Sequence, residues 1–170
     1  MPGTIASLWP QVHEGFRDVD CILHAGDLHV SDVIDELDRI APTFVCTGNG
    51  DLDVVHDKLR EVWVGDLAGV RVGMTHRFPT PRRASAAKLQ KKLSHHFPDG
   101  VPQVVVYGHT HLAELHVVDG RTYINPGSPT LPNNQSTRLG TVGFMELSAA
   151  GVAVELHQIT SEGLSLLESC

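Results

Sequence analysis

No stretch of the 170-residue sequence approaches the roughly 20 consecutive apolar residues that a helix needs to cross a bilayer. The N-terminal residues also lack the charged segment followed by an apolar segment that marks a secretory signal. Both absences argue against a membrane-embedded or secreted protein. The expected location is the cytoplasm.

Cysteine and positive charge are also in short supply. Cys21, Cys46 and Cys170 are too few and too far apart for a disulfide framework, and the first two lie inside apolar runs, where a reduced thiol packs as a small apolar side chain. The chain has 13 Lys and Arg against 20 Asp and Glu, a formal net charge of −7. Nucleic-acid backbones are bound by clustered Lys and Arg, so this balance argues against a nucleic-acid surface.

The chain does contain enough apolar material for a folded enzyme. Hydrophobic residues make up 41% of the sequence, and its length suits one domain spanning residues 1–170. Apolar strands alternate with helical segments at first, and strands dominate later. Helices are predicted over residues 31–40, with Ser31 as N-cap, and 81–96. Hairpins are predicted over residues 112–124 and 141–159, and residues 129–140 read as a surface loop near the site.

Two histidines separated by one residue follow the apolar run 104–107. Strand residues alternate in direction, so His109 and His111 leave the strand end pointing the same way. Imidazole is the commonest nitrogen ligand of divalent metals, and such a pair can bind one ion or two adjacent ions. With 11 histidines in the chain, a chance pair on a solvated loop is the alternative.

Three further polar clusters also follow apolar strands. They are Gly26-Asp27 after residues 20–25, Gly48-Asn49-Gly50-Asp51 after residues 43–46, and Thr75-His76 after residues 70–74. Ligands in open α/β sheets bind beyond the carboxyl ends of the strands. The carboxylate, amide and imidazole groups are therefore predicted to share one site with the histidine pair.

In this order, the four clusters resemble the motifs of the calcineurin-like metallophosphoesterases. Together with residues 125–128, they are most similar to the small phosphodiesterases whose fold is shared by the retromer subunit Vps29. The resemblance covers about residues 20–147. It implies an α/β fold in which a two-layer β-sandwich is flanked by helices, giving four layers in the order α/β/β/α.

The resemblance also implies a site with two divalent metal ions. Asp27 would bridge them, Asn49, His76 and His109 would complete the second metal position, and His111 would serve the first. Manganese is the expected ion, with iron, zinc, cobalt or nickel as alternatives. A metal-bound hydroxide would then attack the phosphorus of a small phosphate ester, with Asp27, Asn49 and His109 as the catalytic residues.

The chain departs from the family at its beginning. The family's first strand ends in Asp-x-His, and no such motif precedes Asp27. Apolar residues between Ile5 and Phe16 recur at helical spacing instead, and Pro10 suits a first helical turn. The loop after the missing motif would fall at residues 1–3. We therefore expect the first strand, which is interior in this fold, to be missing. The favoured explanation is a start codon assigned to an internal methionine, and the alternative is a protein that is naturally short.

Other departures concern the chemistry. Similar proteins carry histidine or cysteine after Gly-Asn, where this chain has Gly50, so leaving-group assistance must come from elsewhere. Asp51 is expected to orient a ligand loop without binding metal. Arg77 either binds a phosphate oxygen or is a solvated loop residue. His29 either approaches the site or stays solvated.

A scaffold is the alternative function. In Vps29 the fold serves protein assembly, and Gly50 and the missing Asp-x-His favour such a metal-binding or protein-interaction module. The retained ligands of the second metal position favour the enzyme. The unpaired sheet edge left by a missing strand is also a surface on which a second copy could pair, giving a homo-oligomer.

Overall fold

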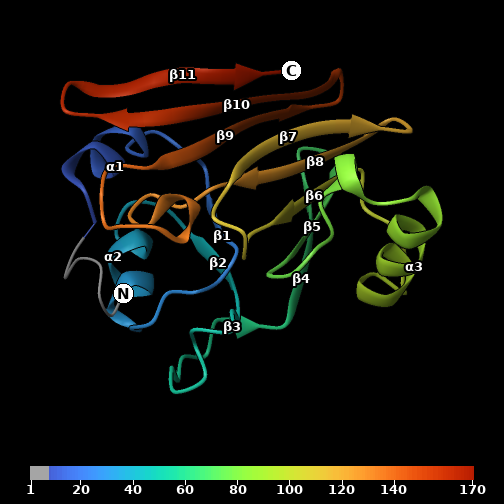
Figure 1. The fold of residues 1–170 in the computed structure, drawn as a ribbon, viewed down its shortest axis with the longest axis horizontal. Helices are drawn as coiled ribbons and strands as arrows, with labels where there is room; N and C mark the ends of the chain where they lie inside the picture. The colour runs from blue at the N-terminus through green and yellow to red at the C-terminus, as the bar shows by residue number, and fades with distance from the viewer. Residues whose placement is uncertain (1–7) are drawn as a thin grey trace.

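The computed structural model describes residues 8–170 as three sheets with helices on their outer faces (Figure 1). The helices are α1 (Pro10–Gly15), α2 (Asp32–Asp38) and α3 (Ala86–His96), with the 3₁₀ turns η1 (Pro81–Arg83) and η2 (Pro132–Asn134). The strands are β1 (Ile22–His24), β2 (Thr43–Cys46), β3 (Leu59–Arg60), β4 (Val62–Leu67), β5 (Val70–Thr75), β6 (Val104–Tyr107), β7 (Ala113–Val118), β8 (Arg121–Pro126), β9 (Thr141–Ser148), β10 (Gly151–Thr160) and β11 (Gly163–Ser169). Among the described helices, none has the length and apolar character to cross a membrane.

The sheets form the two middle layers of a four-layer structure. One layer is the five-stranded sheet β4-β5-β6-β8-β7, and the other holds the sheets β1-β2-β3 and β11-β10-β9. Apolar side chains of both layers share one core, which joins Val72 and Val106 to Cys46 and Leu156. The expected sandwich is confirmed.

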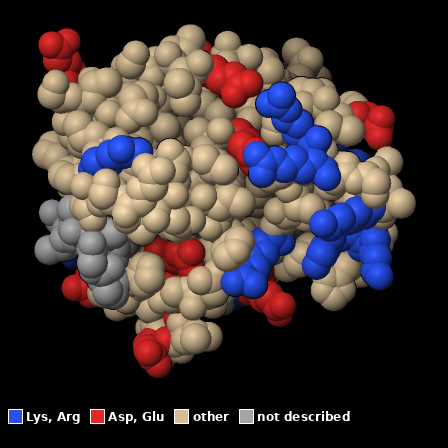
Figure 2. Space-filling model, in the orientation of Figure 1, with Lys and Arg blue, Asp and Glu red and all other residues tan. Residues whose placement is uncertain are grey.

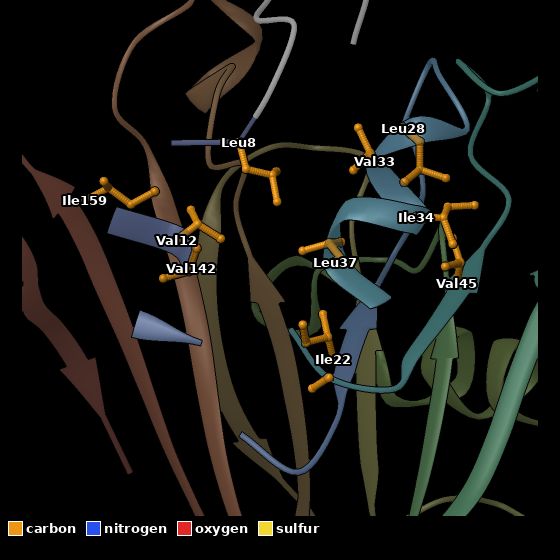
Figure 3. Close-up of a cluster of buried hydrophobic side chains, with 11 residues drawn as sticks. Leu8, Val12, Ile22, Leu28, Val33, Ile34, Leu37, Val45, Val142 and Ile159 are labelled. Carbon is orange, nitrogen blue, oxygen red and sulfur yellow. The ribbon is translucent and has the colours of Figure 1, made fainter. Parts of the chain in front are cut away.

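Helices cover both outer faces. Val12 of α1 and Ile34 and Leu37 of α2 pack over β1, β2 and β9 in one cluster, in which Figure 3 shows Leu37 and Ile22 between Val12 and Val45. On the opposite face, α3 packs on β6 and β8 in a second cluster that includes Leu89, Leu93, Val105 and Tyr123. The layer order is therefore α/β/β/α, as expected.

The helix predictions needed two corrections. Ser31 precedes α2 but its side chain makes no capping hydrogen bond, because its backbone is already in the right-handed helical region (φ −65°, ψ −31°). The helix expected over residues 81–96 is split into η1 and α3, since extended backbone at Ala84 and Ser85 interrupts it. Ser85 accepts a hydrogen bond from the N–H of Lys88 and caps α3.

Parallel pairing aligns the strand ends that carry the polar clusters. β1 pairs in parallel with β2, and β5 with β6. The segments that follow these four strands therefore leave the sandwich at the same edge. They bring Asp27, Asn49, His76 and the pair His109 and His111 to that edge from both sheet layers.

An opening separates the two sheets of one layer. Within residues 8–170, β1 pairs only with β2, and β9 only with β10. A cavity of about 870 Å³ lies between them, and Leu23, Phe144 and Met145 contribute to its wall. Residues 8–21 contain α1 and no strand, as the absent Asp-x-His motif predicts. Residues 1–3, where the loop was expected, lie outside the described residues.

Candidate metal centre

The carboxylate of Asp27 lies at the centre of the polar edge. Its Oδ1 accepts a hydrogen bond of 2.7 Å from the N–H of Gly50. Its Oδ2 lies 3.3 Å from Nε2 of His76 and 3.6 Å from Nε2 of His111. One oxygen is therefore held by the backbone, and the other faces both histidines.

The ring of His76 is oriented so that its Nε2 faces oxygen atoms of Asn49 and Asp27. Its Nδ1 lies 2.7 Å from the carbonyl oxygen of Ala25, so Nδ1 carries the donated proton. In the neutral ring, Nε2 is then an acceptor, and it lies 3.1 Å from the amide oxygen of Asn49. Nitrogen and oxygen lone pairs that converge with a carboxylate in this way suit a cation.

His109 carries the least satisfied group of the site. Its Nδ1 is buried and makes no hydrogen bond to any described residue. The ring centroid lies 5.2 Å from that of His76. Candidate ligand atoms of Asp27, His76 and His109 all lie within 4.8 Å of one another. Buried nitrogen without a partner is costly unless something coordinates it, so this donor set fits a divalent metal ion.

His111 also lies close to the carboxylate of Asp27. Its Nδ1 donates a 2.8 Å hydrogen bond to the carbonyl oxygen of Leu131, which again leaves Nε2 directed toward Asp27. Leu131 belongs to the segment 129–140 that was expected to be a loop near the site, and that expectation is confirmed. A backbone carbonyl thus orients each of two histidines, His76 and His111.

The pKa values of the two histidines of the pair are shifted in opposite directions. The pKa of His109 is lowered, chiefly by burial and then by the charge of Arg77. The pKa of His111 is raised, chiefly by its interaction with the Asp27 carboxylate. Burial alone would raise the pKa of Asp27, but His111, the N–H of Gly50 and His76 together hold it well below its usual range.

Asp51 fixes the loops that carry the site. Its carboxylate accepts hydrogen bonds from the backbone N–H groups of Asp27 (2.8 Å), His29 (2.9 Å) and Gly48 (2.7 Å). The side chain is buried beneath these loops. The predicted orienting role of Asp51 is therefore confirmed.

Strained backbone accompanies the site residues. Asp27, His29, His109 and His111 all have positive φ, between 57° and 68°. Side chains other than glycine adopt this left-handed region at a cost of roughly 1 kcal/mol or more. Hydrogen bonds from the backbone N–H groups of Asp27 and His29 to Asp51 help to hold these two residues in this conformation.

Arg77 lies at the edge of the site with its guanidinium exposed. Its Nη2 donates a 3.0 Å hydrogen bond to the amide oxygen of Asn49. Six of the 13 Lys and Arg residues fall within residues 77–92, a segment without Asp or Glu. Figure 2 shows Lys and Arg gathered on the right of this face, where Figure 1 places α3. The overall negative charge therefore conceals a local concentration of basic residues that begins at Arg77.

All six residues named from the sequence come together at this edge: Asp27, Asn49, His76, Arg77, His109 and His111. The role of His29 was left open by the sequence, and the carbonyl groups of Ala25 and Leu131 were not predicted, because backbone acceptors carry no sequence signal. The only signal for His29 was its position two residues after Asp27.

A sandwich with helices on both faces and a mixed carboxylate, amide and imidazole edge is the arrangement expected of a metallophosphoesterase. The family model of the calcineurin-like phosphoesterase superfamily domain matches residues 5–150. A probable metallophosphoesterase of Methanothermobacter thermautotrophicus is 31% identical over 136 residues, which cover 78% of this chain and 73% of that protein. The chain belongs to the calcineurin-like phosphoesterase superfamily.

Solved structures place its fold near Vps29. Vps29 of Cryptosporidium parvum matches with a TM-score of 0.81 at 15% identity and covers all of this chain and 92% of its own. Vps29 of Entamoeba histolytica, solved in complex with Zn²⁺, matches with a TM-score of 0.75 at 19% identity. The match covers 98% of this chain and 91% of the Vps29 chain. These likenesses concern the fold.

Proposed function

We propose that the chain is a metal-dependent phosphodiesterase acting on a small phosphate ester. The observation that carries this proposal is the convergence of Asp27, His76 and His109, whose candidate ligand atoms lie within 4.8 Å of one another. The buried Nδ1 of the same His109 ring has no partner among the described residues. Acceptors that converge without a shared proton repel one another, and a divalent cation between them removes that repulsion. Membership of the phosphoesterase superfamily agrees with such a centre.

We propose that Asp27, Asn49, His76 and His109 hold one ion, and that Asp27 and His111 contribute to a second. Manganese suits the mixed oxygen and nitrogen donors, as do iron, zinc, cobalt and nickel. When bound, the ions lower the pKa of a water molecule and neutralise phosphoryl oxygens. Ala25 and Leu131 fix the two histidine rings so that each presents Nε2 to Asp27.

The substrate side of the proposal rests on Arg77 and its surroundings. Arg77 is exposed next to Asn49 and can rotate to bind a phosphate oxygen in two-point fashion. The basic segment 77–92 begins at Arg77, and we propose that its charge attracts anions despite the net charge of −7.

A metal-binding scaffold of Vps29 type is the second candidate. One observation favours it: among residues 8–170, only Asp27 and His111 are placed to serve the second ion. With one ion held weakly, hydrolysis would be slow, and the surface of the fold could serve protein assembly instead.

The proposal is tested by hydrolysis of an aryl phosphodiester with and without Mn²⁺. We expect metal-dependent turnover that falls about 10³-fold or more in Asp27→Asn, because water loses its activation when the ion is lost. His95→Ala is the matched control, since His95 is exposed at the end of α3 and should leave turnover unchanged. Absence of hydrolysis with every divalent metal tried would reject the enzyme and favour the scaffold.

A further inference from the structure

The ring of His29 occupies the space that a side chain at position 50 would need. A Cβ atom built on Gly50 would lie 2.5 Å from Cε1, 2.8 Å from Nε2 and 3.0 Å from Nδ1 of His29. These separations are shorter than van der Waals contact. The imidazole therefore packs directly on the glycine, and any larger residue at position 50 would displace it.

The position of His29 is fixed by the loops that carry the metal centre. Its backbone N–H donates to Oδ1 of Asp51, whose other oxygen accepts from the N–H of Asp27. Gly50, beneath the ring, donates its own N–H to the Asp27 carboxylate. Hydrogen bonds thus connect both residues to Asp27: His29 through Asp51, and Gly50 directly.

His29 also lies at the wall of a cavity that three of the candidate ligands line. His29 contributes to the cavity wall together with Asp27, His109 and His111. Its side chain is partly exposed, and no hydrogen bond joins its ring to another residue of the described chain. An imidazole N–H that is free beside the centre is available to an oxygen of a bound ligand.

We propose that His29 is a catalytic residue that donates an N–H hydrogen bond to an oxygen of the substrate's phosphate group. The imidazole of His29 fills the space that a side chain at position 50 would occupy, next to the backbone N–H that binds Asp27. The inference rests on the proposed phosphodiesterase function and names a residue that this function had not used. Donors aimed at oxygens on which charge develops contribute more to the transition state than to substrate binding.

The steric contact makes the inference testable by exchange of the two residues. His29→Gly removes the ring without straining the backbone, because glycine tolerates a φ of 65°. We expect kcat/KM for the aryl phosphodiester to fall about 10²-fold in His29→Gly, as for loss of one preorganised donor. The double variant His29→Gly with Gly50→His returns an imidazole to the same space and should recover at least tenfold of that loss, on the same scale.

Two binding measurements separate a catalytic from a structural role. Mn²⁺ affinity should be unchanged in His29→Gly, whereas inorganic phosphate should bind its Mn²⁺-loaded form less tightly than the wild type. Wild-type kcat/KM and phosphate affinity in His29→Gly would overturn the inference and leave the proposed function standing. A fall in Mn²⁺ affinity that accounts for the lost activity would also overturn it. A wild-type protein without hydrolysis would reject the proposed function, and this inference with it.

Discussion

The site has two unequal halves that share Asp27. The His109 half consists of Asp27, Asn49, His76 and His109, whose groups follow β1, β2, β5 and β6. The His111 half consists of Asp27 and His111, and it depends on the carbonyl group of Leu131 in a surface loop. The difference teaches that strand ends alone can bring four candidate ligands together, whereas the candidate position of His111 has two.

Metal binding should separate the halves most strongly. We expect His109→Ala to lower Mn²⁺ affinity by about 10²-fold or more, since even groups that merely orient ligands are worth 10–100-fold. His111→Ala should lower the affinity of the tighter ion by less than about tenfold, because Asn49, His76 and His109 remain. Calorimetric titration of both variants measures this, and equal losses would show that the halves are equivalent.

Asp51 should affect both halves, because it holds the loops of Asp27 and Gly48. Asp51→Asn replaces one acceptor oxygen with an N–H₂ group. One hydrogen bond is then lost, because the new N–H₂ donor faces a backbone N–H donor. We expect Mn²⁺ affinity to fall by roughly 10-fold, the lower end of the range for groups that orient ligands. Asp53→Asn is the matched control because Asp53 is exposed two residues away. A loss confined to one ion would contradict the shared role.

Protonation should distinguish the halves in the metal-free protein. The pKa of His109 is lowered by burial and that of His111 is raised by Asp27, so His111 should keep its proton to higher pH. A raised pKa in the folded state stabilises the fold below the ordinary histidine value of about 6.5, and this contribution is lost as pH rises through the folded value. The expected effect is small. NMR titration of the ring resonances checks the order, and the reverse order would contradict it.

The strands that carry the site were predictable because their residues follow simple patterns. Apolar runs ending in Gly-Asp, Gly-Asn, Thr-His and Gly-His placed β1, β2, β5 and β6 and their polar ends. β4 and β11 were not predicted from the sequence. Their alternation is incomplete, and no strand of the described part of the chain lies next to their outer edges.

Contacts between distant segments could not be predicted from local pattern. The packing of His29 on Gly50 joins residues from two loops, and the carbonyl partners of His76 and His111 depend on tertiary placement. Net charge was also a poor guide to local charge, because the basic residues concentrate in residues 77–92. Sequence thus identified the ligand types, whereas their orientation required the fold.

The left-handed backbone at Asp27, His29, His109 and His111 has an evolutionary consequence. Glycine adopts this conformation without steric cost, so a glycine at any of these positions would relieve the backbone strain. A lineage freed from its chemistry could gain stability by such replacements, one position at a time. Side chains that persist at these positions are retained at the expense of stability, which makes their loss in a descendant an early sign that the centre has fallen out of use.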